Sequence, residues 1–483
     1  MWRDPTKILS RSGPHVVSDD FTLRVAVIGA GYVGLVSGAC LAEFGHHVTC
    51  IDKDARRIDD LKNGKIPIFE PGLDDIVHVN VAQRRLAFAA NQAGIAEADV
   101  VFIAVGTPAR RSDGHADLSF VYAAVEQIAP LLAPNAVLVT KSTVPVGTGD
   151  EIERMLRERR PDAEFAVVSN PEFLREGAAI EDFRHPDRIV VGTDDARARD
   201  VMAKLYQPLL GVAPFLCVSR RTAEMIKYAA NGFLATKIGF INEIADLCER
   251  AGADVVDVAH GIGLDERIGS KFLRAGPGIG GSCLPKDGMA LIRTALDHGA
   301  PLRILETVCT VNEQRKRAMA RKVAAVLGGS VRGKTIAVLG LTFKADTDDT
   351  RDSPAITLIT ALQDLGGTVR AYDPAGTEQA KLSLSAVEFC GSAYAAAEGA
   401  NALVIATEWQ QFRSLDLARL RDVMAQPLMI DLRNLCDLEK AIQAKFCYVG
   451  IGRAMGIPEP PNHRATGSAG TGNTRRQNKR VQL

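Results

Sequence analysis

The chain has 483 residues, with 58 Lys and Arg balanced by 58 Asp and Glu, 46% apolar residues and 5% aromatic residues. This length predicts two or three domains, and the zero net charge argues against a nucleic-acid binder or a polybasic membrane-surface protein. No segment has the apolar length needed to cross a bilayer, so no membrane partner is expected.

Nine cysteines are scattered along the chain, and the two closest are Cys40 and Cys50. This spacing gives neither a disulfide framework nor a Cys-x-x-Cys metal site, so no metal is expected. Residues 1–21 lack the apolar core of a secretory signal, and residues 456–483 are polar and partly basic. We therefore expect a disordered leader, a disordered basic tail and a location in the reducing cytoplasm.

From residue 23 onward, short β-rich apolar runs alternate with helical stretches. This alternation is typical of a parallel sheet covered by helices on both faces. The expected strands lie at residues 25–29, 48–52, 100–105, 137–141, 165–169 and 188–192. Six such strands fit one doubly wound domain over residues 22–214.

The strand pattern stops after Pro214. Residues 222–250 are expected to form one long helix that ends at Gly252, and further helices are expected from Asp287 to about residue 327. This helical region, residues 215–330, would join two domains or form a dimer interface.

Strands are expected again at residues 335–339, 368–372, 403–406 and 428–431. Between the first two, Ser353 and Pro354 are typical of a helix start, and Gly366 is typical of a helix end. A second, smaller α/β domain is therefore expected over residues 331–455. The predicted fold class is α/β, with two Rossmann-like doubly wound domains joined by a long central helix.

A glycine fingerprint, Gly29-Ala-Gly31-Tyr-Val-Gly34, follows the first strand directly and begins a helix. Such glycines allow close approach to a pyrophosphate, whose charge the helix N-terminus stabilises. Asp52, at the end of the next strand, can accept hydrogen bonds from both ribose hydroxyls and would repel a 2′-phosphate. NAD is therefore expected rather than NADP, although the basic neighbours at residues 53, 56 and 57 would accommodate a phosphate.

Two further strands end in polar loops, at residues 105–108 and 141–148. Ligands of open parallel sheets lie beyond the carboxyl ends of the strands, so Thr107 and Thr143 should face the cofactor or the bond being oxidised. For either loop considered alone, turn formation and helix capping explain its residues better than a role at the cofactor does.

Cys283 follows four glycines within residues 276–281 and precedes helical sequence. The glycine N–H groups are expected to be free to form an anion-binding nest, and both the helix N-terminus and the nearby Lys286 favour a thiolate. By contrast, Cys40, Cys217 and Cys248 lie in apolar sequence typical of inert cysteines. A thiolate beside a dinucleotide site permits oxidation of an alcohol to an aldehyde, then through a thioester to an acid, with two NAD per substrate.

Lys227 and Asn231 lie four residues apart and therefore on one face of the long helix. Apolar neighbours make this a poor place for an ammonium without a function, but a lysine that extends to solvent is equally compatible with the sequence. Glu172 and Glu176 follow a strand, and such a pair usually indicates a solvated helix face.

Together these motifs resemble the nucleotide-sugar 6-dehydrogenase family. The resemblance runs in order from about residue 23 to 452. It includes the glycine fingerprint, Glu70-Pro-Gly72-Leu73, Lys141-Ser-Thr143-Val-Pro145-Val-Gly147-Thr148, Asn170-Pro-Glu172-Phe-Leu-Arg175-Glu176-Gly177, Lys227-Tyr-Ala-Ala-Asn231, the Cys283 segment and Phe343-Lys344-Ala-Asp346-Thr-Asp348-Asp349-Thr-Arg351.

The resemblance implies catalytic roles at matching positions. Cys283 would be the nucleophile that carries the thioester. Lys227 and Asp287 would handle the proton and oxyanion of the first oxidation, with help from Asn231. Thr143 would position a water, and Glu172 would assist hydrolysis of the thioester.

The resemblance also implies two binding sets. The NAD set is Gly29, Gly31, Tyr32, Val33, Gly34, Asp52, Lys53, Thr107, Thr143, Glu176, Lys286 and Arg351. The substrate set is Glu172, Phe173, Leu174, Lys227, Asn231, Arg267, Phe272, Leu273, Gly280, Phe343, Lys344 and Arg433, with Arg267 reaching the sugar from the partner of a homodimer. The expected substrate is UDP-glucose, which would be oxidised to UDP-glucuronate.

Three alternatives remain. The same chemistry would serve a UDP-N-acetylhexosamine or GDP-mannose. A single-step NAD-dependent hydroxy-acid dehydrogenase would use Lys227 and Asn231 without Cys283. A cofactor-sensing or scaffolding protein would use neither, but the complete set of Cys283, Lys227, Asp287 and Thr143 argues against it.

Overall fold

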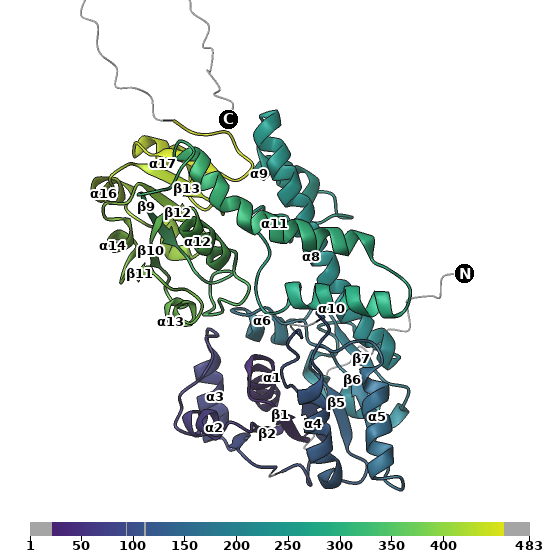
Figure 1. Cartoon of the computed structure of the whole chain (residues 1–483). Coiled ribbons are helices and arrows are strands. Elements are labelled where there is room, and N and C mark those ends of the chain that lie inside the picture. Colours follow the sequence, from purple (N-terminus) through teal and green to yellow (C-terminus); the bar gives the residue numbers. More distant parts are fainter. Residues whose placement is uncertain (1–21, 93, 111–112, 458–483) are drawn as a thin grey trace, which may run out of the picture. The chain divides into compact units, whose positions relative to one another are not determined.

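A computed structural model describes residues 22–92, 94–110 and 113–457. The expected leader and residues 458–483 of the expected tail lie outside these ranges. The chain divides into two compact units. Unit 1 comprises the residues up to Gly232 together with Lys286–Leu302, and unit 2 comprises Phe233–Pro285 and the residues from Arg303 onward. Figure 1 shows a sheet flanked by helices in each unit.

Unit 1 contains an eight-stranded sheet in the order β3-β2-β1-β4-β5-β6-β7-β8. Its strands are β1 (Arg24–Ile28), β2 (His47–Ile51), β3 (Leu86–Ala89), β4 (Val100–Ile103), β5 (Val137–Thr140), β6 (Ala166–Ser169), β7 (Ile189–Gly192) and β8 (Phe215–Val218). The six expected strands are present. The chain order reverses at β1, between β2 and β4, and this is the place where doubly wound sheets bind nucleotides.

The sequence prediction missed β3 and β8. Both are four-residue edge strands, and a run of four apolar residues is too short to distinguish a strand from another buried segment. β8 also corrects the expected helical region, because residues 215–218 pair with β7. β7 itself meets β6 in antiparallel orientation at Ser169 and Gly192, so the sheet is not wholly parallel.

Helices cover both faces of this sheet, as alternation along the strands requires. Val25 and Val27 of β1 belong to one core cluster, and Ala26 belongs to another on the opposite face. The helices are α1 (Tyr32–Glu43), α2 (Ala55–Lys62), α3 (Leu73–Ala82), α4 (Ser119–Ile128), α5 (Thr148–Arg159), α6 (Ala179–Arg184) and α7 (Ala196–Leu205), with short 3₁₀ turns at Ala129–Leu131 and Gln207–Leu209.

The long helix expected after the first sheet is confirmed as α8 (Arg220–Ala251). Gly252 ends it with a φ of 74°, a left-handed conformation that glycine adopts readily. Three further helices follow: α9 (Val255–Gly263), α10 (Leu284–Asp297) and α11 (Arg303–Val326). The expected boundaries at residues 22–214, 215–330 and 331–455 stay a prediction.

Unit 2 contains a six-stranded parallel sheet in the order β11-β10-β9-β12-β13-β14. Its strands are β9 (Thr335–Leu339), β10 (Thr368–Tyr372), β11 (Val387–Phe389), β12 (Ala402–Ile405), β13 (Leu428–Asp431) and β14 (Cys447–Gly450). Its helices are α12 (Pro354–Asp364), α13 (Thr377–Lys381), α14 (Ala393–Ala397), α15 (Gln410–Arg413), α16 (Leu417–Val423) and α17 (Leu438–Gln443). The fold class is confirmed, since both sheets have the Rossmann strand order.

A buried carboxylate, Asp373, directly follows β10 and binds the backbone that follows β9. Its Oδ2 accepts hydrogen bonds from the backbone N–H groups of Leu341 (2.6 Å) and Thr342 (3.1 Å) and from Trp409 Nε1 (3.2 Å). Its Oδ1 accepts from the N–H of Gly376 at 2.6 Å. The backbone donors at the end of β9 are thus bound to the protein itself.

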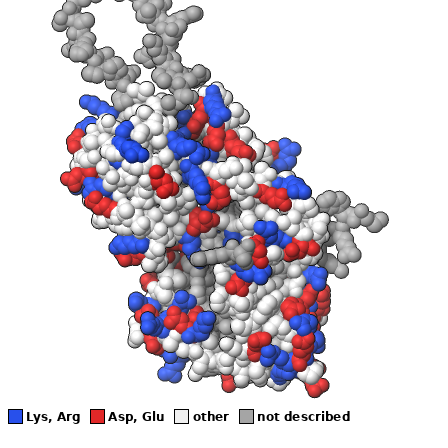
Figure 2. Space-filling model, in the orientation of Figure 1, with Lys and Arg blue, Asp and Glu red and all other residues white. Residues whose placement is uncertain are grey.

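Charged side chains of both signs are interspersed over the faces of the two units that Figure 2 shows. Among the described residues, no helix is long and apolar enough to span a membrane.

Candidate active site

The glycine fingerprint forms the turn from β1 into α1. Gly29 has a φ of 104°, and a Cβ at Gly34 would collide with the carbonyl oxygen of Gly29. Gly31 has no neighbour within 4 Å of where a Cβ would lie, no side chain caps α1, and its first turn carries no acidic residue. These features fit a dinucleotide, because the N-terminus of α1 is open to a pyrophosphate.

Asp52 lies directly at this turn. Its Oδ2 accepts a hydrogen bond from the N–H of Ala30 (2.9 Å) and lies 3.2 Å from Arg57 Nη1. Lys53 Nζ lies 5.0 Å from the centroid of the Phe120 ring. The carboxylate therefore reaches the fingerprint as expected for ribose recognition, and Arg57, one of the basic neighbours that favoured NADP, pairs with it.

Tyr32 connects the fingerprint helix to the segment that carries Glu172 and Glu176. The Tyr32 hydroxyl contacts the buried Glu70 carboxylate and accepts a hydrogen bond from the N–H of Gly177 at 2.7 Å. Glu70 also accepts from the N–H of Ala179 at 2.7 Å. Glu176 directly precedes Gly177 in the chain, and Val33 follows Tyr32 in the first turn of α1.

Lys227 and Glu172 form a buried ion pair. Lys227 Nζ lies 3.1 Å from Glu172 Oε1, and each side chain is 4% exposed. Glu172 Oε2 accepts a hydrogen bond from the N–H of Leu174 at 2.5 Å, and the Phe173 ring centroid lies 5.4 Å from Lys227 Nζ. The interpretation of Lys227 as a solvent-reaching lysine is wrong, and so is that of Glu172 as part of a solvated helix face, because neither side chain reaches water and residues 170–177 are not helical.

Asn231, one turn beyond Lys227 on α8, meets Asp287 on α10. Asn231 Nδ2 donates to Asp287 Oδ2 at 2.6 Å, and Lys286 Nζ lies 2.9 Å from Asp287 Oδ1. Lys286 also donates to Thr107 Oγ1 (3.2 Å), which donates to the carbonyl oxygen of Thr143 (2.9 Å). The structure therefore links five predicted site residues from four parts of the sequence.

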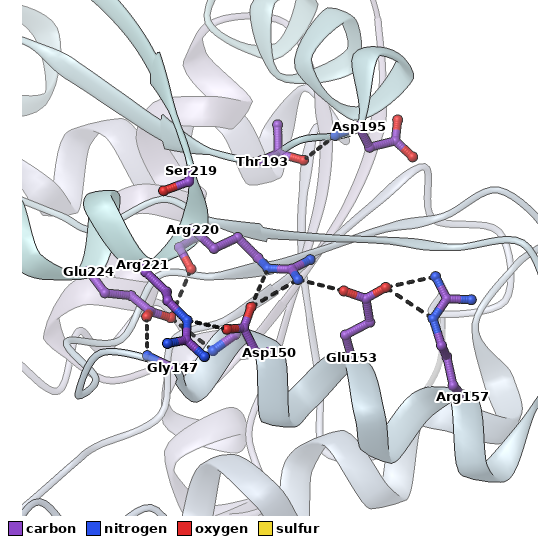
Figure 3. Close-up of polar contacts among 12 residues, drawn as sticks. Gly147, Asp150, Glu153, Arg157, Thr193, Asp195, Ser219, Arg220, Arg221 and Glu224 are labelled. Carbon is purple, nitrogen blue, oxygen red and sulfur yellow. Dashed lines mark hydrogen bonds and ion pairs between the residues drawn. The ribbon is translucent and has the colours of Figure 1, made fainter.

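Glu224 fixes the start of α8 to the Thr143 loop. It lies one turn before Lys227 and is buried, and it accepts hydrogen bonds from the N–H groups of Gly147 (2.7 Å) and Gly149 (2.8 Å) at the start of α5 (Figure 3). Burial raises the pKa of Glu224, and the Gly147 and Gly149 donors oppose that shift.

Around Glu224, ion pairs connect the same two helices. Arg220 and Arg221 of α8 both contact Asp150 of α5, and Arg220 also contacts Glu153 (Figure 3). The helix that carries Lys227 is thus anchored to α5 through several side chains.

Lys141 is a second buried lysine in unit 1. Its Nζ donates to Asn170 Oδ1 and to the Tyr206 hydroxyl, both at 3.1 Å. Burial lowers the pKa of Lys141 to about 8, with Glu172 opposing the shift and Lys227 adding to it. Lys141 therefore belongs electrostatically to the Lys227–Glu172 pair.

In unit 2, Cys283 ends a glycine-rich segment that we call the cysteine loop (residues 276–283). The cysteine is half-buried and directly precedes α10, and its Sγ lies 3.5 Å from Ser282 Oγ. The expectation that the loop glycines leave their N–H groups free is corrected in part. The N–H of Gly276 donates to Asn242 Oδ1 at 2.8 Å, and that of Gly281 donates to the carbonyl oxygen of Arg351 at 3.0 Å.

Phe343 and Arg433 pack against the cysteine loop. A Cβ at Gly281 would lie 2.7 Å from the Phe343 ring, and one at Gly280 would lie 2.6 Å from the backbone oxygen of Asp352. Arg433 Nη2 donates to the carbonyl oxygen of Phe343 at 2.9 Å, and a Cβ at Gly276 would lie 3.1 Å from Arg433 Nη1.

Two other predicted cations, Lys344 and Arg351, contact Phe343 and the loop respectively. Lys344 Nζ lies 5.6 Å from the Phe343 ring centroid. Arg351, whose carbonyl oxygen binds the loop, pairs with Asp349 at 2.7 Å. Unit 2 thus gathers three predicted cations, Lys344, Arg351 and Arg433, around the cysteine loop or the residues that contact it.

The other predicted substrate residues differ from these in their surroundings. The Arg267 side chain is 90% exposed and pairs with Asp265 at 2.6 Å. Leu273 is a buried core residue, next to Phe272 with its φ of 64°. Cys217, expected to be an inert buried cysteine, is exposed on β8.

Sequence reasoning missed several residues that hold these groups. Glu224 had one available indication, its position one turn before Lys227 on the same helix. Lys141 lay within a recognised motif but had no predicted role. For the side chains that bind the cysteine loop, the sequence offers no indication, because their partners lie more than thirty residues away.

Family profiles match three parts of the chain. The UDP-glucose/GDP-mannose dehydrogenase family matches with its NAD binding domain at residues 23–210, its central domain at residues 221–314 and its UDP binding domain at residues 337–438.

Relatives of known name span nearly the same length. The chain is 60% identical over 435 residues to a UDP-glucose 6-dehydrogenase of Rhizobium meliloti (strain 1021), covering 89% of this chain and 100% of the relative. It is 46% identical over 439 residues to UDP-glucose 6-dehydrogenase YwqF of Bacillus subtilis (strain 168), covering 90% and 99%.

Two solved structures are also similar. A UDP-glucose dehydrogenase from Pyrobaculum islandicum has a TM-score of 0.84 and 37% identity, covering 91% of this chain and 100% of that one. A UDP-D-ManNAc dehydrogenase from Pyrococcus horikoshii has a TM-score of 0.79 and 27% identity, covering 89% and 99%.

Proposed function

The chain belongs to the UDP-glucose/GDP-mannose dehydrogenase family and is an NAD-dependent oxidoreductase, and on that premise we propose that it oxidises UDP-glucose to UDP-glucuronate in two steps. The observation that carries the proposal is the buried set of Lys227, Glu172, Asn231 and Asp287, with Cys283 four residues before Asp287 in the chain. The names of the relatives favour UDP-glucose among nucleotide sugars.

The first step converts the 6-hydroxyl carbon of the sugar into an aldehyde. Bound NAD supplies the hydride acceptor. The hydroxyl proton passes to the Lys227–Glu172 pair, directly or through a water held by Thr143. Asn231, which Asp287 orients through their hydrogen bond, donates to the developing oxyanion. Burial of these groups strengthens their electrostatic effect on the reacting oxygen.

The second step uses Cys283. Its Sγ adds to the aldehyde carbon while the thiol proton passes to the aldehyde oxygen, which gives a thiohemiacetal. The thiohemiacetal gives up its hydroxyl proton to a nearby base and a hydride to a second NAD, and so becomes a thioester. Water, activated by Glu172, then releases the acid and restores the thiol. One substrate thus consumes two NAD and one water.

We assign the nucleotide end of the substrate to unit 2. Lys344 and Arg433 supply cations suited to a diphosphate, and their place beside the cysteine loop supports this assignment. Phe272, Leu273 and Gly280 would shape the pocket, Leu273 from within the core. Arg351, Glu176 and Lys286 are assigned to the cofactor.

We further propose a homodimer built on α8. Phe233, Phe240 and Leu247 are 66%, 51% and 60% exposed and lie seven residues apart, so they form one apolar stripe. If a partner subunit covers this stripe, Arg267, which is exposed in its own chain, would reach the substrate that the partner binds. Sedimentation should show a dimer that Phe240→Asp dissociates; a wild-type monomer would contradict this proposal.

We place the reaction in the cytoplasm. The nine cysteines are widely spaced in the sequence and give no disulfide framework, and this favours a reducing compartment.

The decisive experiment counts NADH released per UDP-glucose with enzyme in excess. Two equivalents and UDP-glucuronate are expected, whereas one equivalent with an aldehyde product would favour single-step chemistry. The assay should be repeated with a UDP-N-acetylhexosamine and with GDP-mannose, because one similar solved structure is a UDP-D-ManNAc dehydrogenase. Preference for either alternative would overturn the choice of sugar.

A further inference from the structure

We propose that three buried side chains, Asn242, Asn312 and Arg315, form a loop clamp that positions Cys283 for the second oxidation. The inference rests on the proposed function, in which Cys283 is the nucleophile. The clamp residues do not contact the reacting atoms, so they are positioning residues.

Asn312 of α11 binds both backbone groups of Ile279. Its Oδ1 accepts from the Ile279 N–H at 2.7 Å, and its Nδ2 donates to the Ile279 carbonyl oxygen at 3.1 Å. Only an amide side chain of this length offers one donor and one acceptor side by side in this way. Ile279 lies four residues before Cys283.

Gly276, at the start of the loop, is held in the same manner by two residues. Asn242 Oδ1 accepts from its N–H at 2.8 Å, and Arg315 Nε donates to its carbonyl oxygen at 2.7 Å. Arg315 Nη1 also donates to the backbone oxygen of Asn242 (3.1 Å) and pairs with Asp246 (2.8 Å). The clamp therefore joins α8, α11 and the cysteine loop.

The opposite side of the loop is closed by residues that follow β9. The Gly281 N–H donates to the Arg351 carbonyl oxygen, and the next residue, Asp352, is paired with the buried Lys316 of α11 at 2.7 Å. Phe343 fills the space where a Gly281 side chain would lie. The loop is thus bound at residues 276, 279 and 281, all within seven residues of the sulfur.

Such fixation has a chemical purpose. A segment with four glycines in six residues has more backbone freedom than a segment with few glycines. Attack of a sulfur on a carbonyl carbon requires the two atoms near contact in a defined direction, and a displacement of about 1 Å can slow such a step about a hundredfold. The buried clamp removes this freedom.

The clamp should therefore act on one half of the reaction. The first oxidation uses Lys227, Glu172, Asn231 and Asp287, which belong to unit 1. Thiohemiacetal formation and the second oxidation use Cys283. Loosening the clamp should slow the second step and leave the first nearly unchanged, whereas a general loss of folding would reduce both.

The test compares Asn312→Asp with Gln314→Glu. Both variants change an amide to a carboxylate on α11, but Gln314 is exposed whereas Asn312 is buried. Aspartate at 312 can still accept from the Ile279 N–H but cannot donate to its carbonyl oxygen. Rapid-mixing measurements of NADH formation would use UDP-glucose for both steps and the UDP-linked 6-aldehyde for the second step alone.

For Asn312→Asp we expect oxidation of the aldehyde to fall about tenfold or more and the first oxidation to fall less than about twofold. The aldehyde should then accumulate and be trapped by semicarbazide. Gln314→Glu should match wild type. Equal losses in both steps, or no loss in either, would overturn the inference.

Arg315→Lys provides a second variant if Asn312→Asp does not fold. It keeps the charge beside Asp246 but cannot reach all three partners of the guanidinium at once, so the same partition between steps is expected. Failure of the proposed function would be seen separately, as a wild-type enzyme that releases one NADH or forms no hydroxylamine-sensitive ester on Cys283.

Discussion

Lys227 Nζ lies 3.1 Å from Glu172 Oε1 in a place where neither side chain reaches water. Taking two charges out of water is costly, and each charge of the pair offsets part of that cost for the other. The pair is therefore both a structural element and the expected acceptor of the first proton.

Lys227→Met should lower the free energy of unfolding by about 3–5 kcal/mol, because it leaves Glu172 buried without this cation. It should also slow the first oxidation by about a hundredfold or more. Arg154→Gln is the matched control, since Arg154 pairs with Glu151 on the exposed face of α5 and should contribute less than about 1 kcal/mol. Urea denaturation and initial rates measure these effects, and equal destabilisation by the two variants would contradict the burial argument.

Cys283→Ser should abolish formation of the acid while the first oxidation continues at a reduced rate. A serine hydroxyl is a far weaker nucleophile than a thiolate, so the aldehyde or an ester adduct should accumulate. Mass spectrometry of the protein and chromatography of the nucleotide sugars would detect both. Cys309→Ser, a half-buried cysteine on α11, is the control and should retain two NADH per substrate. Full double oxidation by Cys283→Ser would remove the nucleophile assignment.

Asp52→Asn should raise the preference for NADP relative to NAD by about tenfold. The variant loses the charged hydrogen bonds to the ribose of NAD and no longer repels the 2′-phosphate of NADP. Asp54→Asn is the control, because Asp54 caps α2 through the N–H groups of Arg56 and Arg57. The measurement is kcat/KM for each cofactor. An unchanged ratio in Asp52→Asn would move ribose recognition elsewhere.

Lys141 makes stability depend on pH at alkaline values. Burial lowers the pKa of Lys141 from 10.5 to about 8, so the unfolded chain binds a proton that the folded protein lacks between these values. Stability should therefore rise with pH in this window, by about 2 kcal/mol from pH 7.5 to 9.5.

Lys141→Met lacks this titration, so its free energy of unfolding should fall relative to wild type by the same amount as pH rises. Lys65→Met, at a lysine whose side chain is 73% exposed, should show no such trend. Urea denaturation at both pH values provides the measurement. If the free energy of unfolding changed with pH by the same amount in wild type and in both variants, Lys141 would not be a buried titrating lysine.

The sequence predicted the fold where local chemistry decides it. The apolar run of β1, the glycines after it and the Ser353–Pro354 start of α12 all act over a few residues, and all are present as expected. The prediction missed β3, β8, β11 and β14, which are all edge strands of three or four residues, because so short a run does not show a strand period. β7 pairs antiparallel with β6 because of the path that the chain takes between the two strands, and no local sequence pattern indicates that path.

The candidate site shows the same division. Lys227 and Asn231 were placed on one helix face by their spacing alone, but their partners, Glu172 and Asp287, lie 55 and 56 residues away. Only folding decides whether a lysine among apolar residues extends to water or is buried against a carboxylate. Asn312 is the extreme case, since a polar residue in a helix ordinarily indicates a solvent-facing side.

The carboxylate of Asp373 has a consequence for the stoichiometry of cofactor binding. The two sheets have the same strand order, so topology alone would allow a nucleotide at each reversal of that order. At β9, however, two consecutive backbone N–H groups donate to Asp373, whereas at β1 a single N–H donates to Asp52 and no side chain caps the N-terminus of α1. A second dinucleotide would have to displace an internal anion and meet its repulsion. The duplicated architecture therefore yields chemically distinct halves, and equilibrium titration should find one NAD per chain.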